Sequence, residues 1–140
     1  MRLFLDANVI CTAAHNPRGR SAALFDLASR GRGRLSTSAH PAVEAERNLG
    51  LKYPPARGRL AAVMRMLTME PEAAAADVAW ALTQGLPSKD APVLAAAVAS
   101  GADALVTGDR THFGHLFGRT VRGVTVLPPA DALALVVARR

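Results

Sequence analysis

Residues 89–109 have the sequence KDAPVLAAAVASGADALVTGD, in which an alanine-rich helix leads directly into a buried strand. The expected helix, 89–100, ends at Gly101, because glycine is favoured at the left-handed position that closes a helix. The next segment, 104–107 (ALVT), predicts a strand covered on both faces, as in a parallel sheet. A glycine turn then places Asp109 just beyond the carboxyl end of that strand.

The same alternation of strands and helices extends over the whole chain. Expected strands lie at 2–5, 35–37, 67–70, 104–107 and 124–127. Expected helices lie at 8–15, 21–30, 38–49, 56–66, 73–84, 89–100 and 111–117, with a last one after Pro129. This alternation predicts an α/β fold with a mostly parallel sheet and helices on both of its faces. The length suits a single domain spanning residues 1–140.

The chain is basic, with 17 lysines and arginines against 11 acidic residues, a formal net charge of +6 and a sequence pI near 11. This charge favours a polyanionic partner such as nucleic acid, although an arginine- and alanine-rich composition explains it equally well. Aromatic residues make up only 4% of the chain, so stacking of single-stranded bases has little support. Any nucleic acid would be held mainly by its phosphates.

The apolar runs are too short for a membrane span. The longest, 93–99 and 132–138, fall far below the ~20 residues that a transmembrane helix needs. The N-terminal run is interrupted by Asp6 before it reaches the length of a signal-peptide core. Cys11 is the only cysteine, which excludes an intramolecular disulfide and a cysteine-rich zinc site. These features predict a soluble, cytoplasmic protein in which Cys11 is a small buried apolar residue.

Two carboxylates are placed together by the expected topology. Asp6 follows the strand at 2–5, and Asp109 follows the strand at 104–107. Ligands of open parallel α/β sheets bind beyond the carboxyl ends of the strands. A basic chain is not expected to gather carboxylates without a cation, so the pair indicates a metal site. Taken singly, each aspartate is more simply explained as a turn former or a helix cap.

Two further acids lie on expected helices. Asp90 falls in the first turn of the helix at 89–100, where Ser88 can cap the helix and the helix dipole favours the ionised carboxylate. Glu44 lies inside another helix, and Glu46 points roughly 200° away around the same axis. Only one of these two glutamates can therefore face a shared site, and the residue pattern leaves the choice open.

Carboxylates without a histidine or cysteine partner suit a hard divalent cation such as Mg²⁺ or Mn²⁺, and one or two such ions can support phosphodiester hydrolysis. Asn8 and Thr107, each two residues from an acid, could hydrogen-bond to a ligand carboxylate. His112 and His115 could share a helix face, but two histidines without a third ligand predict a structural role and not a zinc site. Asp103, at the amino end of the strand that leads to Thr107, is expected to be structural.

Four segments, taken in order, resemble the PIN-domain family, which includes the VapC-type toxins. The segments are LFLDANV (3–9), VEAERNL (43–49), KDAPVLAAAV (89–98) and ADALVTGDRTHF (102–113). The resemblance covers essentially the whole chain and implies a three-layer α/β/α sandwich. It also implies a metal-dependent endoribonuclease whose acidic cluster holds Mg²⁺ or Mn²⁺.

Carried over by position, the family's catalytic metal ligands fall on Asp6, Glu44, Asp90 and Asp109. Glu46 stays the alternative to Glu44, and Thr107 matches the hydroxyl residue often found before the fourth acid. The resemblance further implies an RNA substrate, a homodimer and, for the toxins, a small antitoxin that silences the enzyme. Arg110 or Arg47 could then hold the RNA phosphates.

Two other functions are compatible with these residues. A PIN-like fold without turnover could bind RNA or a protein partner through its basic surface. A phosphatase that uses Asp6 as its nucleophile also fits an aspartate after the first strand. This second alternative is disfavoured, because the LDANV segment lacks a second nearby acid and Lys89 precedes a helix instead of ending a strand.

Overall fold

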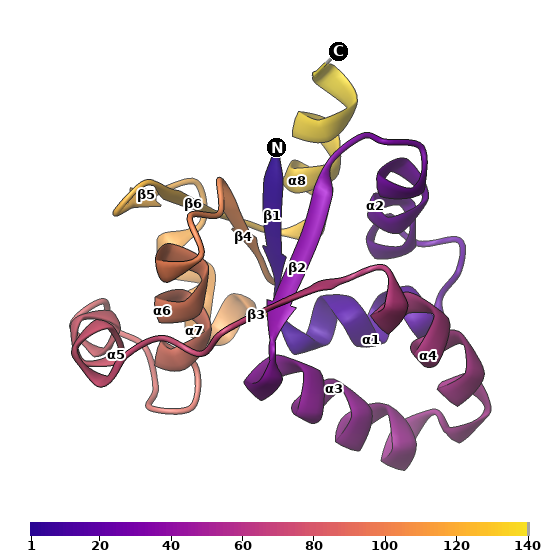
Figure 1. Ribbon diagram of the computed structural model, residues 1–140, viewed down its shortest axis with the longest axis horizontal. Coiled ribbons are helices and arrows are strands. Elements are labelled where there is room, and N and C mark those ends of the chain that lie inside the picture. The colour runs from indigo at the N-terminus through magenta and orange to yellow at the C-terminus, as the bar shows by residue number, and fades with distance from the viewer. Residues whose placement is uncertain (140) are drawn as a thin grey trace.

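Figure 1 shows a central sheet with helices on either side, in the computed structural model that describes residues 1–139. The strands are β1 (Arg2–Leu5), β2 (Arg34–Ser38), β3 (Thr68–Glu70), β4 (Ala104–Val106), β5 (Thr120–Val121) and β6 (Val124–Leu127). They lie in the order β3-β2-β1-β4-β6-β5, and every neighbouring pair is parallel except β5 and β6. The predicted α/β fold with a mostly parallel central sheet is confirmed.

Helices cover both faces of this sheet (Figure 1). In the described residues they are α1 (Ala7–His15), α2 (Arg20–Ser29), α3 (Ala39–Lys52), α4 (Arg57–Arg65), α5 (Ala75–Leu82), α6 (Ala91–Ala99), α7 (Arg110–Phe113) and α8 (Pro129–Ala138), with the 3₁₀ helices η1 (Pro54–Ala56) and η2 (Gly114–Leu116). Helices α1, α2, α4 and α8 contribute to the core on one face, and α5 and α6 to the core on the other. None of the helices between residues 1 and 139 has the length and apolar character of a membrane span.

Alternate residues of the central strands fill two separate cores. Leu3 and Leu5 of β1 pack with Val106 of β4 on the α1 side, whereas Phe4 and Leu105 pack on the α6 side. The alternation arises because successive side chains of a strand point to opposite faces of the sheet. All five side chains are fully buried. Strands β1 and β4 are therefore covered on both faces, as their continuous apolar sequences predict.

Strands β5 and β6 form an antiparallel hairpin, of which the residue pattern predicts only the second strand. The connecting residues, Arg122 and Gly123, both have positive φ, 46° and 83°. Such a pair suits a tight two-residue hairpin turn, which asparagine or aspartate before glycine normally signals. Because an arginine stands before Gly123, the sequence carries no turn signal at this point.

Other predicted elements are found with shifts at their ends. The helix expected at 111–117 is divided between α7 and η2, and the helix expected at 73–84 is shortened to α5. Gly101 has a φ of 71°, which confirms the predicted left-handed cap after α6. The expected placement at the start of α6 is wrong: Asp90 precedes the first turn as the cap residue, and neither Ser88 nor another side chain caps the helix.

Two residues outside the carboxylate site hold elements together. Asp103 Oδ2 accepts a hydrogen bond of 2.8 Å from the backbone N–H of Arg2, which confirms its structural role at the amino end of the sheet. Cys11 is half-buried, and not fully buried as expected, and its thiol donates to the carbonyl of Ala45 over 3.2 Å. This bond joins α1 to α3, and burial raises the pKa of the thiol.

Leu105→Ala tests the central strand. The Leu105 side chain is fully buried, so we expect its truncation to lower the free energy of unfolding by about 2 to 5 kcal/mol. Leu82→Ala makes the same chemical change where the residue is 45% exposed, and should lower the free energy of unfolding much less, because a solvent-exposed side chain leaves no enclosed cavity. Urea unfolding followed by circular dichroism compares the two variants. Equal losses would contradict the placement of Leu105 in the core.

Candidate active site

The carboxyl ends of β1 and β4 lie side by side, and each is followed by a predicted site residue. Leu5 pairs with Val106 in the parallel register, and the backbone N–H of Asp6 donates to the Val106 carbonyl over 3.0 Å. Asp6 then caps α1, while Asp109 caps α7. The topological placement of these two aspartates at one edge of the sheet is confirmed, and their capping roles coexist with it.

Hydrogen bonds hold the Asp6 carboxylate in one orientation. Its Oδ1 accepts from the backbone N–H of Ala7 over 2.8 Å, and its Oδ2 accepts from the Thr107 hydroxyl over 2.8 Å. The Asn8 side chain also donates to Oδ2 over 3.2 Å, and its own oxygen accepts from the Gly108 backbone over 2.7 Å. Asn8 and Thr107 thus support a site carboxylate, in the positions that the sequence suggested. A carboxylate oxygen has two lone-pair directions, so Oδ1, which accepts one bond, keeps capacity for a further ligand, whereas Oδ2 already accepts two.

The Asp6 carboxylate carries its negative charge in an unfavourable place. Burial raises the pKa of Asp6 to about 6, although the hydrogen bonds from Thr107 and Ala7 partly oppose the rise. The negative charges of Glu44 and Asp90 add to it. Near neutral pH the group is ionised but destabilised, which is the state that a nearby cation would relieve.

Asp90 and Asp109 meet at a third side chain, His112. The ring atom Nδ1 lies 2.9 Å from Asp90 Oδ2 and 2.9 Å from Asp109 Oδ2. The backbone N–H of His112 donates to the other oxygen of Asp109 over 3.0 Å. One potential ligand atom from each of these three residues lies within 4.8 Å of the other two, a spacing compatible with a shared metal ion. They come from two places in the chain: Asp90 lies at the start of α6, and Asp109 and His112 lie at the start of α7.

Two buried atoms of this group lack a hydrogen-bond partner among the described residues. They are Asp90 Oδ2 and His112 Nδ1, which lie close together without hydrogen-bond geometry. Burial raises the pKa of Asp90, which His112 and Lys89 oppose and Asp109 and Glu44 reinforce. A buried carboxylate oxygen without a partner costs free energy unless a cation or proton occupies the space before it.

The structure separates the two glutamates of α3. Glu44 is half-buried, and its charge raises the pKa of Asp6, Asp90 and Cys11. Glu46 is exposed and lines a different hollow, between α3 and α4, together with Arg57. The charge of Glu44 thus acts on the other carboxylates, whereas Glu46 lies on the side of α3 that borders α4.

Three sequence expectations need correction or refinement. The expectation that the carboxylates have no histidine partner is wrong, because His112 lies against two of them. His115 does not share a site with it, since its Nε2 lies 2.7 Å from the Gln84 carbonyl. The cluster with mutual metal-ligand spacing consists of Asp90, Asp109 and His112, with Asp6 and Glu44 beside it.

The donor set fits a divalent cation. Carboxylate oxygens predominate, and Asp90 Oδ2 is buried without a partner among residues 1–139. Oxygen ligands suit Mg²⁺ and Mn²⁺, while the imidazole of His112 adds a nitrogen that borderline transition metals also accept. Of the two arginines suggested for phosphate binding, Arg110 directly follows Asp109 and Arg47 lies exposed on α3.

A family model described as the PIN domain matches residues 2–111 of the chain. A comparison with curated protein sequences finds no match.

Solved structures share the fold at low sequence identity. PAE2754 from Pyrobaculum aerophilum is 20% identical, with a TM-score of 0.72 over 99% of this chain and 91% of its own. VapBC2 from Rickettsia felis, bound to a DNA fragment from their promoter, is 14% identical, with a TM-score of 0.66 over 91% of this chain and 98% of its own. VapC20 of Mycobacterium tuberculosis, a sarcin-ricin loop cleaving toxin, is 15% identical, with a TM-score of 0.54 over 76% of this chain and 91% of its own.

The raised pKa of Asp6 predicts an unusual dependence of stability on pH. In the unfolded chain an aspartate titrates near pH 3.9, whereas folded Asp6 titrates near 6. Between these values the folded protein keeps a proton that the unfolded chain has released, so this contribution to stability is lost as the pH rises. The full loss is about 3 kcal/mol and is reached above pH 6.

Asp6→Asn removes this titration. Urea unfolding in EDTA, from pH 4 to pH 7.5, should show the stability of the variant rising relative to the parent by about 3 kcal/mol. Asp103→Asn, which changes an exposed aspartate, should show no such trend. A stability difference between Asp6→Asn and the parent that stays constant with pH would contradict the assigned pKa.

Proposed function

The chain belongs to the PIN-domain family, and on that premise we propose that it is a metal-dependent endoribonuclease that hydrolyses RNA phosphodiester bonds. The observation that supports this best is the approach of four carboxylates from separate segments at one edge of the sheet, one of them with a buried oxygen that lacks a partner in the described residues. The domain is proposed to span residues 1–140, because β6 and α8, beyond the matched region, belong to the same sheet and core.

Asp6, Glu44, Asp90 and Asp109 are the proposed metal ligands, with Mg²⁺ or Mn²⁺ as the ion. When bound, such an ion supplies the positive charge that stabilises a phosphodiester transition state and activates water for the attack. The carboxylates' role is to hold that charge where the phosphate binds. Asp90 and Asp109 are best placed to do so, since their oxygens already meet within metal-ligand spacing.

Three neighbouring side chains act as positioning residues. Thr107 and Asn8 hold the Asp6 carboxylate through bonds of 2.8 Å and 3.2 Å, so it does not have to reorient when a substrate arrives. His112 Nδ1 lies 2.9 Å from an oxygen of each of the other two aspartates, and the His112 backbone N–H holds Asp109 through a bond of 3.0 Å. Its Nδ1 can direct a proton at only one of the two oxygens at a time.

An RNA substrate is supported by charge and by likeness. The net charge of +6 attracts a polyanion over long range. Arg110, exposed directly after Asp109, is placed to meet a phosphate that approaches the acids. VapC20, which shares the fold, is a sarcin-ricin loop cleaving toxin. That the present chain also cuts RNA is our proposal.

We further propose that the nuclease is the toxin of a toxin-antitoxin pair, acting in the cytoplasm as a homodimer. The likeness to VapBC2 and VapC20 supports the toxin role. Exposed apolar side chains on α3 and just beyond it support a protein interface, above all Leu51 at 78% and Val43 at 56% exposure. Such side chains are covered at a lower free energy by a second copy or by an antitoxin than by water.

Glu44→Gln and Glu46→Gln test the metal site with one chemical change on opposite sides of α3. Because the charge of Glu44 acts on the other carboxylates, we expect Glu44→Gln to weaken Mn²⁺ binding by about 10- to 100-fold or more and to lower RNA cleavage in parallel. Glu46→Gln should match the parent in both. Isothermal titration calorimetry measures the binding, and cleavage of a labelled RNA in Mn²⁺ or EDTA measures turnover.

The alternative of a binding module without turnover gives a different result. In that case RNA is bound equally well in EDTA and by both glutamate variants, and no cleavage appears in Mn²⁺. This outcome, with circular dichroism showing that the parent protein is folded, would reject the enzyme.

The toxin role predicts growth arrest when the chain is expressed in a bacterial host without an antitoxin. Asp109→Asn should abolish the arrest, since it removes a proposed ligand charge but keeps the oxygen that accepts the His112 backbone N–H. Asp103→Asn, at the other end of the same strand, should stay as toxic as the parent. Normal growth with the active parent enzyme would favour an RNA-processing role instead.

A further inference from the structure

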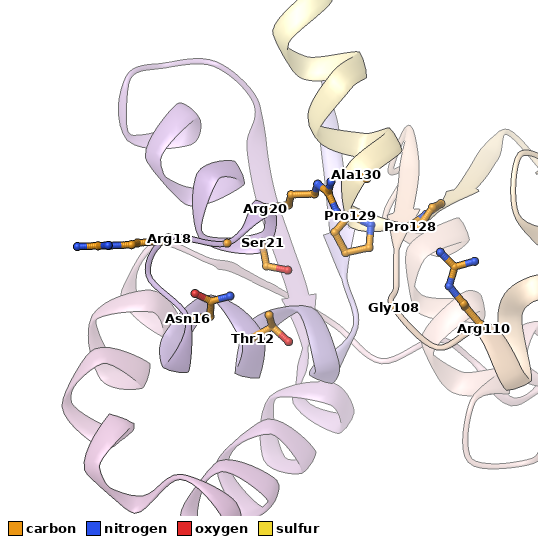
Figure 2. A pocket seen from close by; sticks show the side chains of 11 residues that line it. Thr12, Asn16, Arg18, Arg20, Ser21, Gly108, Arg110, Pro128, Pro129 and Ala130 are labelled. Atoms are coloured by element: carbon orange, nitrogen blue, oxygen red, sulfur yellow. The ribbon is translucent and has the colours of Figure 1, made fainter.

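A pocket of about 540 Å³ lies between the starts of α2 and α8 and the residues that flank Asp109 in the sequence (Figure 2). Gly108 and Arg110, the residues on either side of Asp109, form part of its wall, and Thr12 of α1 forms another part. The remaining wall comes from the connection between α1 and α2, from Pro128, and from the first residues of α2 and α8. The pocket therefore opens next to the proposed metal site without containing any of its ligands.

Two helices present their amino ends to this pocket. Helix α2 starts after Gly19 and helix α8 starts after Pro128, and no side chain caps either helix. Both helices are ten residues long. Backbone N–H groups at a helix start lack partners within the helix, and the aligned peptide dipoles give that end a partial positive charge. Two such ends at one pocket favour an anion.

Ser21 independently indicates a ligand. The residue is only 3% exposed, yet it lines the pocket. Among the described residues its hydroxyl has no hydrogen-bond partner. Figure 2 shows this hydroxyl pointing from α2 toward the space that Arg110 approaches from the opposite side. The hydroxyl faces the open space of the pocket, so it is free to donate its proton to a ligand oxygen.

The side-chain charges around the pocket are of one sign. Arg18, Arg20 and Arg110 belong to its lining, and no acidic residue does. Arg20 and Arg110 extend along the opening, while Arg18 points away from it (Figure 2). Within residues 1–139 none of the three forms an ion pair with a carboxylate. Arginine is common in this chain, so the combination with Ser21 and the two helix ends distinguishes this pocket from other basic surface.

We propose that this pocket binds one backbone phosphate of the RNA strand, next to the phosphate that reaches the carboxylates. Arg20 and Arg110 would contact its oxygens from two sides, and the Ser21 hydroxyl and the start of α2 would donate to it from the floor. This inference rests on the proposed function, because it assigns the substrate strand a path across the site. The RNA strand would then run over the starts of α2 and α8.

Binding of a labelled single-stranded RNA of about 12 nucleotides in EDTA tests the pocket without cleavage. Fluorescence anisotropy at several KCl concentrations gives the affinity and its salt dependence. We expect Arg20→Ala and Arg110→Ala each to weaken binding by about tenfold at low salt and to lower the slope of log Kd against log salt by about 0.7. Ser21→Ala should weaken binding without changing the slope, because the hydroxyl carries no charge.

Arg119→Ala is the matched control, since Arg119 is an exposed arginine before β5 and outside this pocket. It should leave the affinity and the slope unchanged. An Arg119→Ala variant that behaves like Arg20→Ala would overturn the proposal, because binding would then depend only on overall charge.

Titration of the parent with inorganic phosphate, followed by nuclear magnetic resonance, separates this proposal from the proposed function. The backbone amide signals of Arg20, Ser21 and Ala130 should shift in EDTA, whatever the outcome for cleavage. If RNA is cleaved as proposed but these amides do not move, the pocket proposal alone fails. If they shift but Glu44→Gln keeps full activity, the proposed metal ligand fails and the pocket stands. Shifts caused by an acidic peptide such as hexaglutamate but not by RNA would overturn the assignment in favour of a protein partner.

Discussion

The parallel pairing of β1 with β4 is the constraint on which the site depends. Leu5 lies opposite Val106, and the next backbone bond, from Asp6 to the Val106 carbonyl, extends the ladder by one residue. That extra bond brings the Thr107 hydroxyl to within 2.8 Å of the Asp6 carboxylate. A shift of one residue in this register would move every side chain of the strand to the opposite face and would also bury charge in the apolar core. The packing of Leu5 and Val106 on one face and Leu105 on the other therefore determines the position of the acids.

The same burial that fixes Asp6 makes its charge unfavourable. The pKa of Asp6 is raised to about 6 by burial and, further, by Glu44 and Asp90, so the ionised acids destabilise one another as well as the fold. A divalent cation would relieve all of these interactions at once, because each carboxylate would gain a near partner of opposite charge. Without an ion, the buried ionised acids therefore lower the free energy of unfolding of the chain. This opposition between stability and site geometry is typical of functional sites and absent from the apolar core around Leu105.

The sequence predicted the parts of this site that depend on periodicity and topology. Asp6 and Asp109 follow apolar strands, so the rule that parallel strands end at one edge was enough to place them together. Glu44 and Glu46 differ by the phase of one helix, but the choice between them required the packing of α3 against α1, which no local pattern encodes. The sequence singled out His112 but missed its contact with the acids, because that contact joins α7 to the start of α6 and the distance between those elements depends on how both pack on the sheet. The hairpin of β5 and β6 was missed for a local reason, since Arg122 occupies a position where asparagine or aspartate is the usual signal.

An α/β sheet brings strand carboxyl ends and helix amino ends to the same edge, and this chain uses both. Acids that follow β1 and β4 give one half of the edge a negative charge. The uncapped starts of α2 and α8, with Arg20 and Arg110, give the adjoining half a positive charge. Acids alone would repel an RNA strand, and arginines alone would bind it without chemistry. Salt screens the electrostatic attraction between exposed groups beyond ~10 Å. The two halves must therefore be neighbours if the charges of both are to act on one RNA strand. Their adjacency follows from topology, because Asp109, in the loop after β4, belongs to one half and the start of α8, the helix after neighbouring β6, belongs to the other.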